Sequence, residues 1–184
     1  MKVTATELPE VLLIEPRVFP DDRGHFFEAW RDQGYAEAGI HGPFVQDNFS
    51  RSTKGTLRGL HFQEPYGQGK LVTILSGRVF DVAADIRRDS PRFGQWVGAE
   101  LDGDRPRQIW IPPGFAHGFC VLSERADFFY KCTDYYNPES ERAIRWNDPE
   151  LAIEWPIESP VLSAKDAAAP LLADAPVLPS LTDG

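Results

Sequence analysis

Turn residues divide the chain into short extended segments, and no long helical pattern connects them. Glycine occurs 15 times and proline 16 times among 184 residues. Only residues 31–39 and 166–172 are predicted as short helices, the first weakened by an interior glycine. Closely spaced short strands without helices between them favour an antiparallel barrel or a double-sheet jelly roll. The predicted strands are residues 11–19, 25–30, 44–50, 58–63, 70–86 (broken at Ser76-Gly77), 95–101, 107–111, 118–122 and 126–133.

Composition narrows the class of protein. Hydrophobic residues make up 42% and charged residues 26%, which is typical of one globular domain over residues 1–184 with a loose tail at 173–184. A net charge of −9 disfavours nucleic-acid binding. The chain shows no apolar run long enough for a membrane span and no apolar segment of a secretory signal. Two cysteines, Cys120 and Cys132, without metal-ligand spacing indicate a reducing cytoplasm.

The segment 58–63 contains the first candidate for chemistry. In a strand, successive side chains point to opposite faces, so Leu60 and Phe62 are expected in the core. His61 and Gln63 then face the space that the sheet encloses, next to Gly59, which has no side chain. An imidazole in an open, concave position suits proton transfer because its pKa lies near neutrality. Taken alone, this segment fits a hydrogen-bonded structural histidine inside a barrel better than a catalytic one, and the rest of the chain changes that balance.

Two stretches can be compared with the metal motifs of cupins, a jelly-roll class. The first motif, G-x5-H-x-H-x3/4-E-x6-G, corresponds here to His61, then Gln63 and Lys70, with six residues before Gly77. The second motif, P-x-G-x2-H, is intact at residues 112–117 and ends at His117. Two imidazoles are therefore retained, and an ammonium replaces the carboxylate. Since a cation at a ligand position repels a divalent metal, no metal is expected.

The altered motif predicts a reaction. A lysine ammonium can stabilise the negative oxygen that a metal would otherwise polarise. With His61 as base, the expected step is proton abstraction beside a carbonyl, and return of the proton from the opposite face gives an epimer. Tyr130 is a candidate for this acid because it shares a strand face with Phe128 and Cys132. The same tyrosine could be a core residue with its hydroxyl at the rim.

The motifs, taken together, resemble those of the dTDP-4-dehydrorhamnose 3,5-epimerase family over residues 11–172. The resemblance implies an all-β fold of the cupin type, a double-stranded β-helix or jelly roll with a few short peripheral helices. The matching stretches follow in order: Val18-Phe19, Asp22-Arg23-Gly24, Phe44-Val45-Gln46-Asp47-Asn48, residues 57–63, Gly69-Lys70-Leu71-Val72, Phe80-Asp81-Val82, residues 93–98, residues 111–119, residues 130–136, Trp146-Asn147-Asp148 and residues 162–169.

The resemblance also implies residue roles, without a cofactor. His61 would take protons from C5 and C3 of a dTDP-4-keto-6-deoxy sugar, with Asp166 orienting the imidazole. Tyr130 would protonate the opposite face, and Lys70 would stabilise the enolate. The remaining implied contacts are His117 with the sugar or its phosphate; Arg58, Lys165 and Arg23 with the diphosphate; Glu28, Gln46, Asn48, Tyr136 and Glu141 with the thymidine end; and Phe19 and Phe26 stacking on the base.

Two further expectations concern geometry. In the family the N-terminal strands, about residues 1–50, cross to the partner of a homodimer, so Arg23 and Glu28 would serve the neighbour's pocket. Simple alternation places Arg58 on the Leu60 face, so Arg58 reaches a pocket phosphate only from the strand's end or through a bulge.

Other interpretations are open at this stage. Taken singly, each of the implied cationic side chains is more often a solvated surface group, and Gln46 and Asn48 could be ordinary edge-strand residues. Among functions, a deoxysugar epimerase acting at C3 or C5 alone fits the same side chains. A metal-binding cupin, disfavoured by Gln63 and Lys70, and a non-catalytic sugar-nucleotide-binding module belong to other classes.

Overall fold

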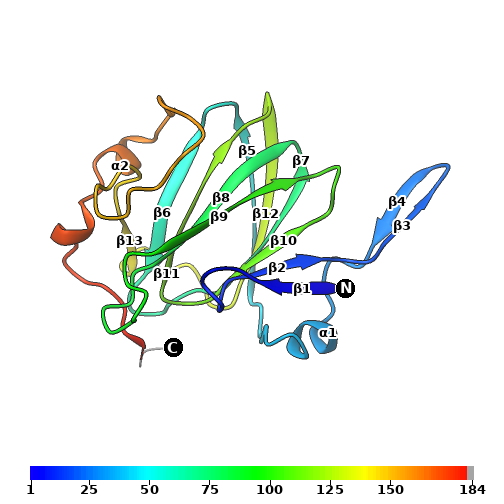
Figure 1. Cartoon of the computed structure of the whole chain (residues 1–184), viewed down its shortest axis with the longest axis horizontal. Helices are drawn as coiled ribbons and strands as arrows, with labels where there is room; N and C mark the ends of the chain where they lie inside the picture. Colours follow the sequence, from blue (N-terminus) through cyan, green and yellow to red (C-terminus); the bar gives the residue numbers. More distant parts are fainter. Residues whose placement is uncertain (182–184) are drawn as a thin grey trace.

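The computed structural model describes residues 1–181 and shows two antiparallel sheets packed face to face, as the sequence predicts (Figure 1). The six-stranded sheet has the order β1 (Lys2–Ala5), β2 (Leu12–Glu15), β10 (Gln108–Ile111), β7 (Lys70–Ser76), β12 (Arg125–Cys132), β5 (Gln46–Thr53). The five-stranded sheet has the order β13 (Glu141–Ala143), β6 (Leu57–Gln63), β11 (Phe115–Val121), β8 (Arg78–Asp85), β9 (Trp96–Asp102). The prediction of a jelly roll with short peripheral helices is confirmed.

Apolar side chains from the two sheets meet in one core. Val72 and Phe128 come from the six-stranded sheet, and Val79 and Phe119 come from the five-stranded sheet. The rings of Phe119 and Phe128 stack across the interface with 3.9 Å between their centroids. Burial of apolar area in such a core is the main force that holds two sheets together.

Strand β8 differs from the half-buried strand that its alternation predicts. Val82 and Ala84 lie beneath the C-terminal segments in a second apolar cluster, while Asp81 and Asp85 face the interior and are fully buried. The prediction failed because the chain beyond β13 covers the outer face of the five-stranded sheet. A buried carboxylate needs partners; Asp85 has them in Arg87 (2.7 and 2.9 Å) and a serine hydroxyl.

The covering layer carries the late helical elements, α2 (Ala164–Ala167) and the 3₁₀ turn η1 (Leu172–Asp174). Helix α2 begins two residues before the predicted start because Ser163 caps it, its Oγ accepting from the Asp166 backbone N–H at 3.0 Å. Of the predicted tail, Pro179 accepts a hydrogen bond from the Arg88 N–H at 3.0 Å, and residues 182–184 lie outside the described part. None of the helices in residues 1–181 is long and apolar enough to cross a membrane.

The N-terminal region ends in a projecting hairpin. The predicted strand 11–19 is interrupted at Pro16, giving β2 and then β3 (Val18–Asp21). Within residues 1–181, β3 pairs only with β4 (Gly24–Phe27). This hairpin, called the arm below, extends away from the two sheets (Figure 1). Helix α1 (Asp32–Ala36) follows inside the predicted range 31–39.

Candidate active site

A cavity of about 270 Å³ opens between the two sheets and receives side chains from both. The five-stranded sheet contributes Arg58, His61, His117 and Phe119, and the six-stranded sheet contributes Asn48, Phe49, Ser50, Lys70, Phe128 and Tyr130. The structure thus brings together six of the residues that the sequence singled out, from strands β5, β6, β7, β11 and β12.

A bulge in β6 places Arg58 beside His61. In the pairing with β11, His61 lies opposite His117 and Arg58 opposite Phe119, so three residue steps on β6 match two on β11. Gly59 absorbs the extra residue with a φ of +131°. A Cβ there would lie 2.5 Å from the Cα of Gly118, so only glycine fits without a shift. Of the two routes that the sequence left open for Arg58, the end of the strand or a bulge, the structure has the bulge.

His61 and Asp166 form a close pair across 105 residues of sequence. The two atoms His61 Nε2 and Asp166 Oδ1 are 2.6 Å apart, and the Asp166 side chain is 5% exposed. Burial alone would raise the pKa of Asp166, but the hydrogen bond and charge of His61, with the Ser163 hydroxyl, hold this pKa below its usual value. An ionised Asp166 can orient the imidazole and stabilise its protonated form.

The opposite wall carries Tyr130 and Lys70. The Tyr130 hydroxyl and the Lys70 ammonium make no hydrogen bond or ion pair with the described residues, although both side chains line the cavity. Burial raises the pKa of Tyr130 to about 12, so its proton is present at neutral pH. Burial lowers the pKa of Lys70, opposed by the charges of Cys132, Asp81 and Glu141. Both groups are therefore available to a substrate.

His117 is paired with a carboxylate that sequence reasoning missed. Its Nε2 lies 3.0 and 3.1 Å from the two oxygens of Asp81, which comes from the neighbouring strand β8. Burial lowers the pKa of His117 and raises that of Asp81, and the attraction between them opposes both shifts. The signal available in the sequence was a carboxylate in the middle of a long apolar strand.

Polar residues near the cavity form two small networks. Glu141 on β13 accepts from the Tyr136 hydroxyl (2.7 Å) and pairs with the Lys165 ammonium. Burial raises the pKa of Glu141, but the hydrogen bonds from Lys165 and Tyr136 and the charge of Lys165 hold this pKa below its usual value. Gln46 donates to Asn48 (3.0 Å) and accepts from the Tyr136 backbone N–H (2.9 Å).

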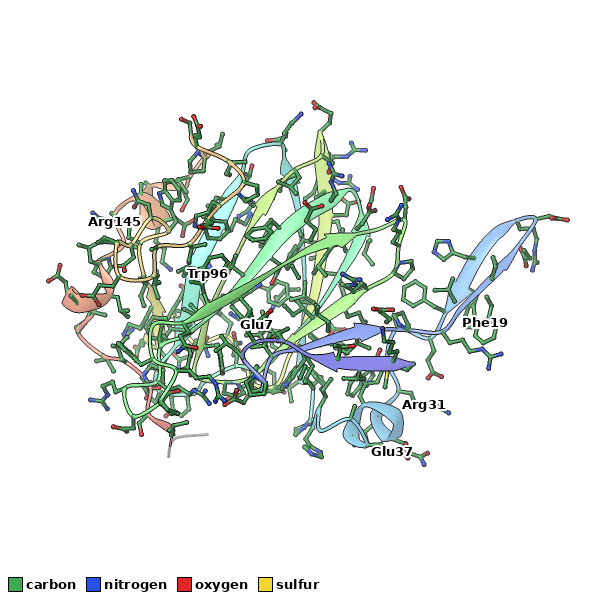
Figure 2. The ribbon with its side chains drawn as sticks, in the orientation of Figure 1. Glu7, Phe19, Arg31, Glu37, Trp96 and Arg145 are labelled. Atoms are coloured by element: carbon green, nitrogen blue, oxygen red, sulfur yellow. The ribbon has the colours of Figure 1, made fainter. Side chains whose placement is uncertain are left out.

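Four predicted substrate-binding residues lie on or beside the arm and do not line this chain's cavity. Figure 2 shows Phe19 on the arm, away from the sheets. Phe26 is 67% exposed, and Phe19 is 46% exposed. Arg23 pairs with Asp21 at 2.6 Å, and Glu28 pairs with Arg31 at 3.1 Å. Within one chain, these residues are not part of the site.

Gln63 does not face the cavity, in contrast to the prediction from simple alternation. Its amide donates to the carbonyls of Tyr66 (2.8 Å) and Tyr135 (3.2 Å) and accepts from the Asn137 N–H (2.8 Å). The end of β6 is thus used to fix loops. The cavity presents two imidazoles and an ammonium, and residues 1–181 contain no cluster of three or more potential metal ligands. This donor set does not fit the metal site of a cupin.

Comparison with known proteins agrees with this geometry. The family profile described as dTDP-4-dehydrorhamnose 3,5-epimerase matches residues 5–174. A protein of that name from Pseudomonas aeruginosa is 57% identical over 181 residues, covering 97% of this chain and 100% of the relative.

The chain belongs to the dTDP-4-dehydrorhamnose 3,5-epimerase family.

Solved structures of this epimerase family have the same fold. The Legionella pneumophila enzyme dTDP-6-deoxy-D-glucose-3,5-epimerase, in complex with dTDP-4-keto-L-rhamnose, is 58% identical with a TM-score of 0.94, and the match covers 97% of each chain. A 3'-monoepimerase from Streptomyces bikiniensis in complex with dTDP-quinovose is 33% identical with a TM-score of 0.92. The match covers 97% of this chain and 93% of the monoepimerase chain. The fold therefore occurs with more than one positional specificity.

Proposed function

We propose that this protein is an isomerase that converts dTDP-4-dehydro-6-deoxy-D-glucose into dTDP-4-dehydro-L-rhamnose by inverting C3 and C5 without a cofactor. The observation that carries the proposal is the placement of a paired imidazole, His61, on one sheet and a free phenol, Tyr130, on the other. A sugar ring between the sheets meets a base on one face and an acid on the other. The high identity to relatives of this name supports the choice of substrate.

The chemistry follows from the arrangement of the groups. The Nε2–H of His61 donates to Asp166, so Nδ1 carries the lone pair that accepts a proton from carbon next to the ketone. The electrons of the C–H bond move to the keto oxygen, where the Lys70 ammonium stabilises the enolate. Tyr130 then gives its proton to the same carbon from the opposite face. Each inversion leaves an imidazolium and a phenolate, which return to the starting state by proton exchange with solvent.

The cations at the cavity support binding of a diphosphate. Arg58 lies in the cavity wall with its Nε donating to Ser52 Oγ at 3.1 Å. Lys165 pairs with Glu141 and is the neighbour in sequence of Asp166, the partner of His61. We assign both to the diphosphate, and Gln46, Asn48, Tyr136 and Glu141 to the nucleoside end. This local positive field acts within a protein of net charge −9.

The exposed arm supports a homodimer of single-domain chains. The arm presents Phe19 and Phe26 to solvent, and its two strands pair with no other strand among residues 1–181. Large apolar side chains on a projecting hairpin are typical of a contact surface. We therefore propose that the arm, with Arg23 and Glu28, enters the pocket of a second copy.

We also propose that the enzyme works in the cytoplasm, because Cys120 and Cys132 are free thiols, as is typical of a reducing compartment.

Solvent isotope exchange tests the function. The protein is incubated with dTDP-4-dehydro-6-deoxy-D-glucose in D₂O, and deuterium at C3 and C5 is read by NMR. The proposal predicts label at both carbons and the L-rhamno product, whereas label at one carbon identifies a single-position epimerase. His61→Asn is the matched control and should abolish exchange at both positions; retained exchange at C5 would refute the assignment of the base.

A further inference from the structure

Two histidine–aspartate pairs stand side by side at the cavity. His61 and His117 are direct partners in the pairing of β6 with β11. Each uses Nε2 to contact a carboxylate, Asp166 for His61 and Asp81 for His117. The mechanism uses only the first pair, so the second requires its own explanation.

The two pairs differ in their contact with water. The side chains of His61 and Asp166 are 31% and 5% exposed, whereas those of His117 and Asp81 are 8% and 0% exposed. Charging an imidazole is costly in a dry site. Lys70 stands near both members of the second pair, and its positive charge opposes protonation of His117. His117 is therefore a neutral imidazole.

A neutral imidazole carries one proton, and Asp81 decides which nitrogen holds it. An ionised carboxylate only accepts hydrogen bonds. Both oxygens of Asp81 approach Nε2, so the proton lies on Nε2. Burial raises the pKa of Asp81, and the attraction to His117 and Lys70 opposes this shift. The approach of both oxygens to one ring nitrogen is the geometry of a carboxylate that accepts a single N–H.

The other nitrogen of His117 is consequently an acceptor. Nδ1 makes no hydrogen bond with the described residues and is not sealed from solvent, and the His117 side chain lines the cavity. A bare lone pair at this place repels a phosphate or a keto oxygen, both of which lack a proton to donate. It attracts a hydroxyl.

We propose that Asp81 is a positioning residue that fixes His117 in the Nε2–H tautomer, so that His117 selects a sugar hydroxyl at the wall opposite Tyr130 and takes no part in binding the diphosphate. The proposal rests on the proposed function for the identity of the ligand, a sugar nucleotide. It narrows the two roles that the family resemblance gave His117 to one.

The tautomer can be measured without substrate, so this test does not depend on the proposed function. The four histidines are labelled with ¹⁵N, and His117→Gln identifies the signals of His117 in long-range ¹⁵N–¹H correlation spectra. At neutral pH, Nε2 should be protonated and Nδ1 bare. An Nδ1–H tautomer or an imidazolium would overturn the proposal, whatever the enzyme's activity.

Asp81→Asn tests the consequence for binding. The amide removes the charge and offers a donor to Nε2, so His117 should shift toward the Nδ1–H form, and kcat/KM should fall about 10- to 100-fold, the usual effect of a lost buried hydrogen bond. Affinity for dTDP, measured by calorimetry, should stay within about 2-fold because the diphosphate does not use His117. An equal loss of dTDP affinity would contradict the assigned role.

Asp85→Asn is the matched control. Asp85 lies on the same strand and is also fully buried, but it pairs with Arg87 and Ser90 and does not line the cavity. This variant should lower the melting temperature and leave the His117 signals unchanged. If both variants lost activity only in proportion to their loss of folded protein, Asp81 would be structural; if Asp81→Asn does not fold, the wild-type spectrum decides alone.

Discussion

Gly59→Ala should show how strongly one residue without a side chain shapes the site. Gly59 has a φ of +131°, which other residues rarely adopt, and this strain is worth about 1–3 kcal/mol. Its new Cβ would also lie 2.5 Å from the Gly118 Cα and 2.9 Å from the His117 carbonyl oxygen. These are backbone atoms of a central strand, which cannot rotate away, so overpacking adds roughly 1–3 kcal/mol.

The combined loss of about 2–6 kcal/mol is a large part of a typical free energy of unfolding of about 5–15 kcal/mol. Urea unfolding followed by tryptophan fluorescence measures it, and kcat/KM reports whether Arg58 and His61 still share one face. Relief of the clash by loss of the bulge would turn Arg58 out of the cavity, so activity should fall more than the folded fraction.

Gly94→Ala separates the two contributions. Gly94 also has a positive φ, +79°, but nothing lies within 4 Å of the place its Cβ would take. This variant should lose only about 1 kcal/mol and keep full activity. If Gly59→Ala is no less stable than Gly94→Ala, or keeps wild-type kcat/KM, the argument that the bulge depends on glycine is wrong.

Three further changes test separate parts of the site. Tyr130→Phe should lower kcat about 10²- to 10⁴-fold with little change in KM, because it removes the acid and leaves the shape of the wall; a larger effect on KM in steady-state assays would count against this role. Arg58→Ala should mainly raise KM, read from the same assays, and an unchanged KM would exclude a diphosphate contact. The folded-state pKa of Asp166 lies below its unfolded value of 3.8, so its pairing with His61 stabilises the fold above about pH 4 and is lost as pH falls further. Acid unfolding by circular dichroism should therefore be less steep in Asp166→Asn below pH 4, and an identical curve would refute that contribution.

Local sequence rules were sufficient where one strand and its alternation decide the result. They placed Leu60 and Phe62 in a core and His61 in the cavity, and the structure agrees. They were insufficient where a distant segment covers one face of a strand. The alternation in β8 predicts one exposed face, but the C-terminal layer buries Val82 and Ala84, and Asp81 lies in the interior instead of in solvent.

Contacts between residues far apart in the sequence could not be predicted from the spacing of residues along the chain. No local pattern joins His61 to Asp166, and only the family resemblance implied this contact, which the structure places at 2.6 Å. Gln63 and His61 lie on the same side of the bulge, so the bulge does not explain why Gln63 misses the cavity. Gln63 is the last residue of β6, and its amide is bound by loop residues that come much later in the chain, which alternation within one strand cannot predict.

The division of the reacting groups between two sheets has an evolutionary consequence. In the proposed mechanism, removal of a proton and its return depend on side chains of different strands, so a mutation can alter one step and leave the other intact. A change confined to β12 would produce a protein that exchanges hydrogen with water but hands back the original sugar. New stereochemical outcomes can thus arise by editing a single wall, while the imidazole, its aspartate and the loop that caps α2 stay as they are.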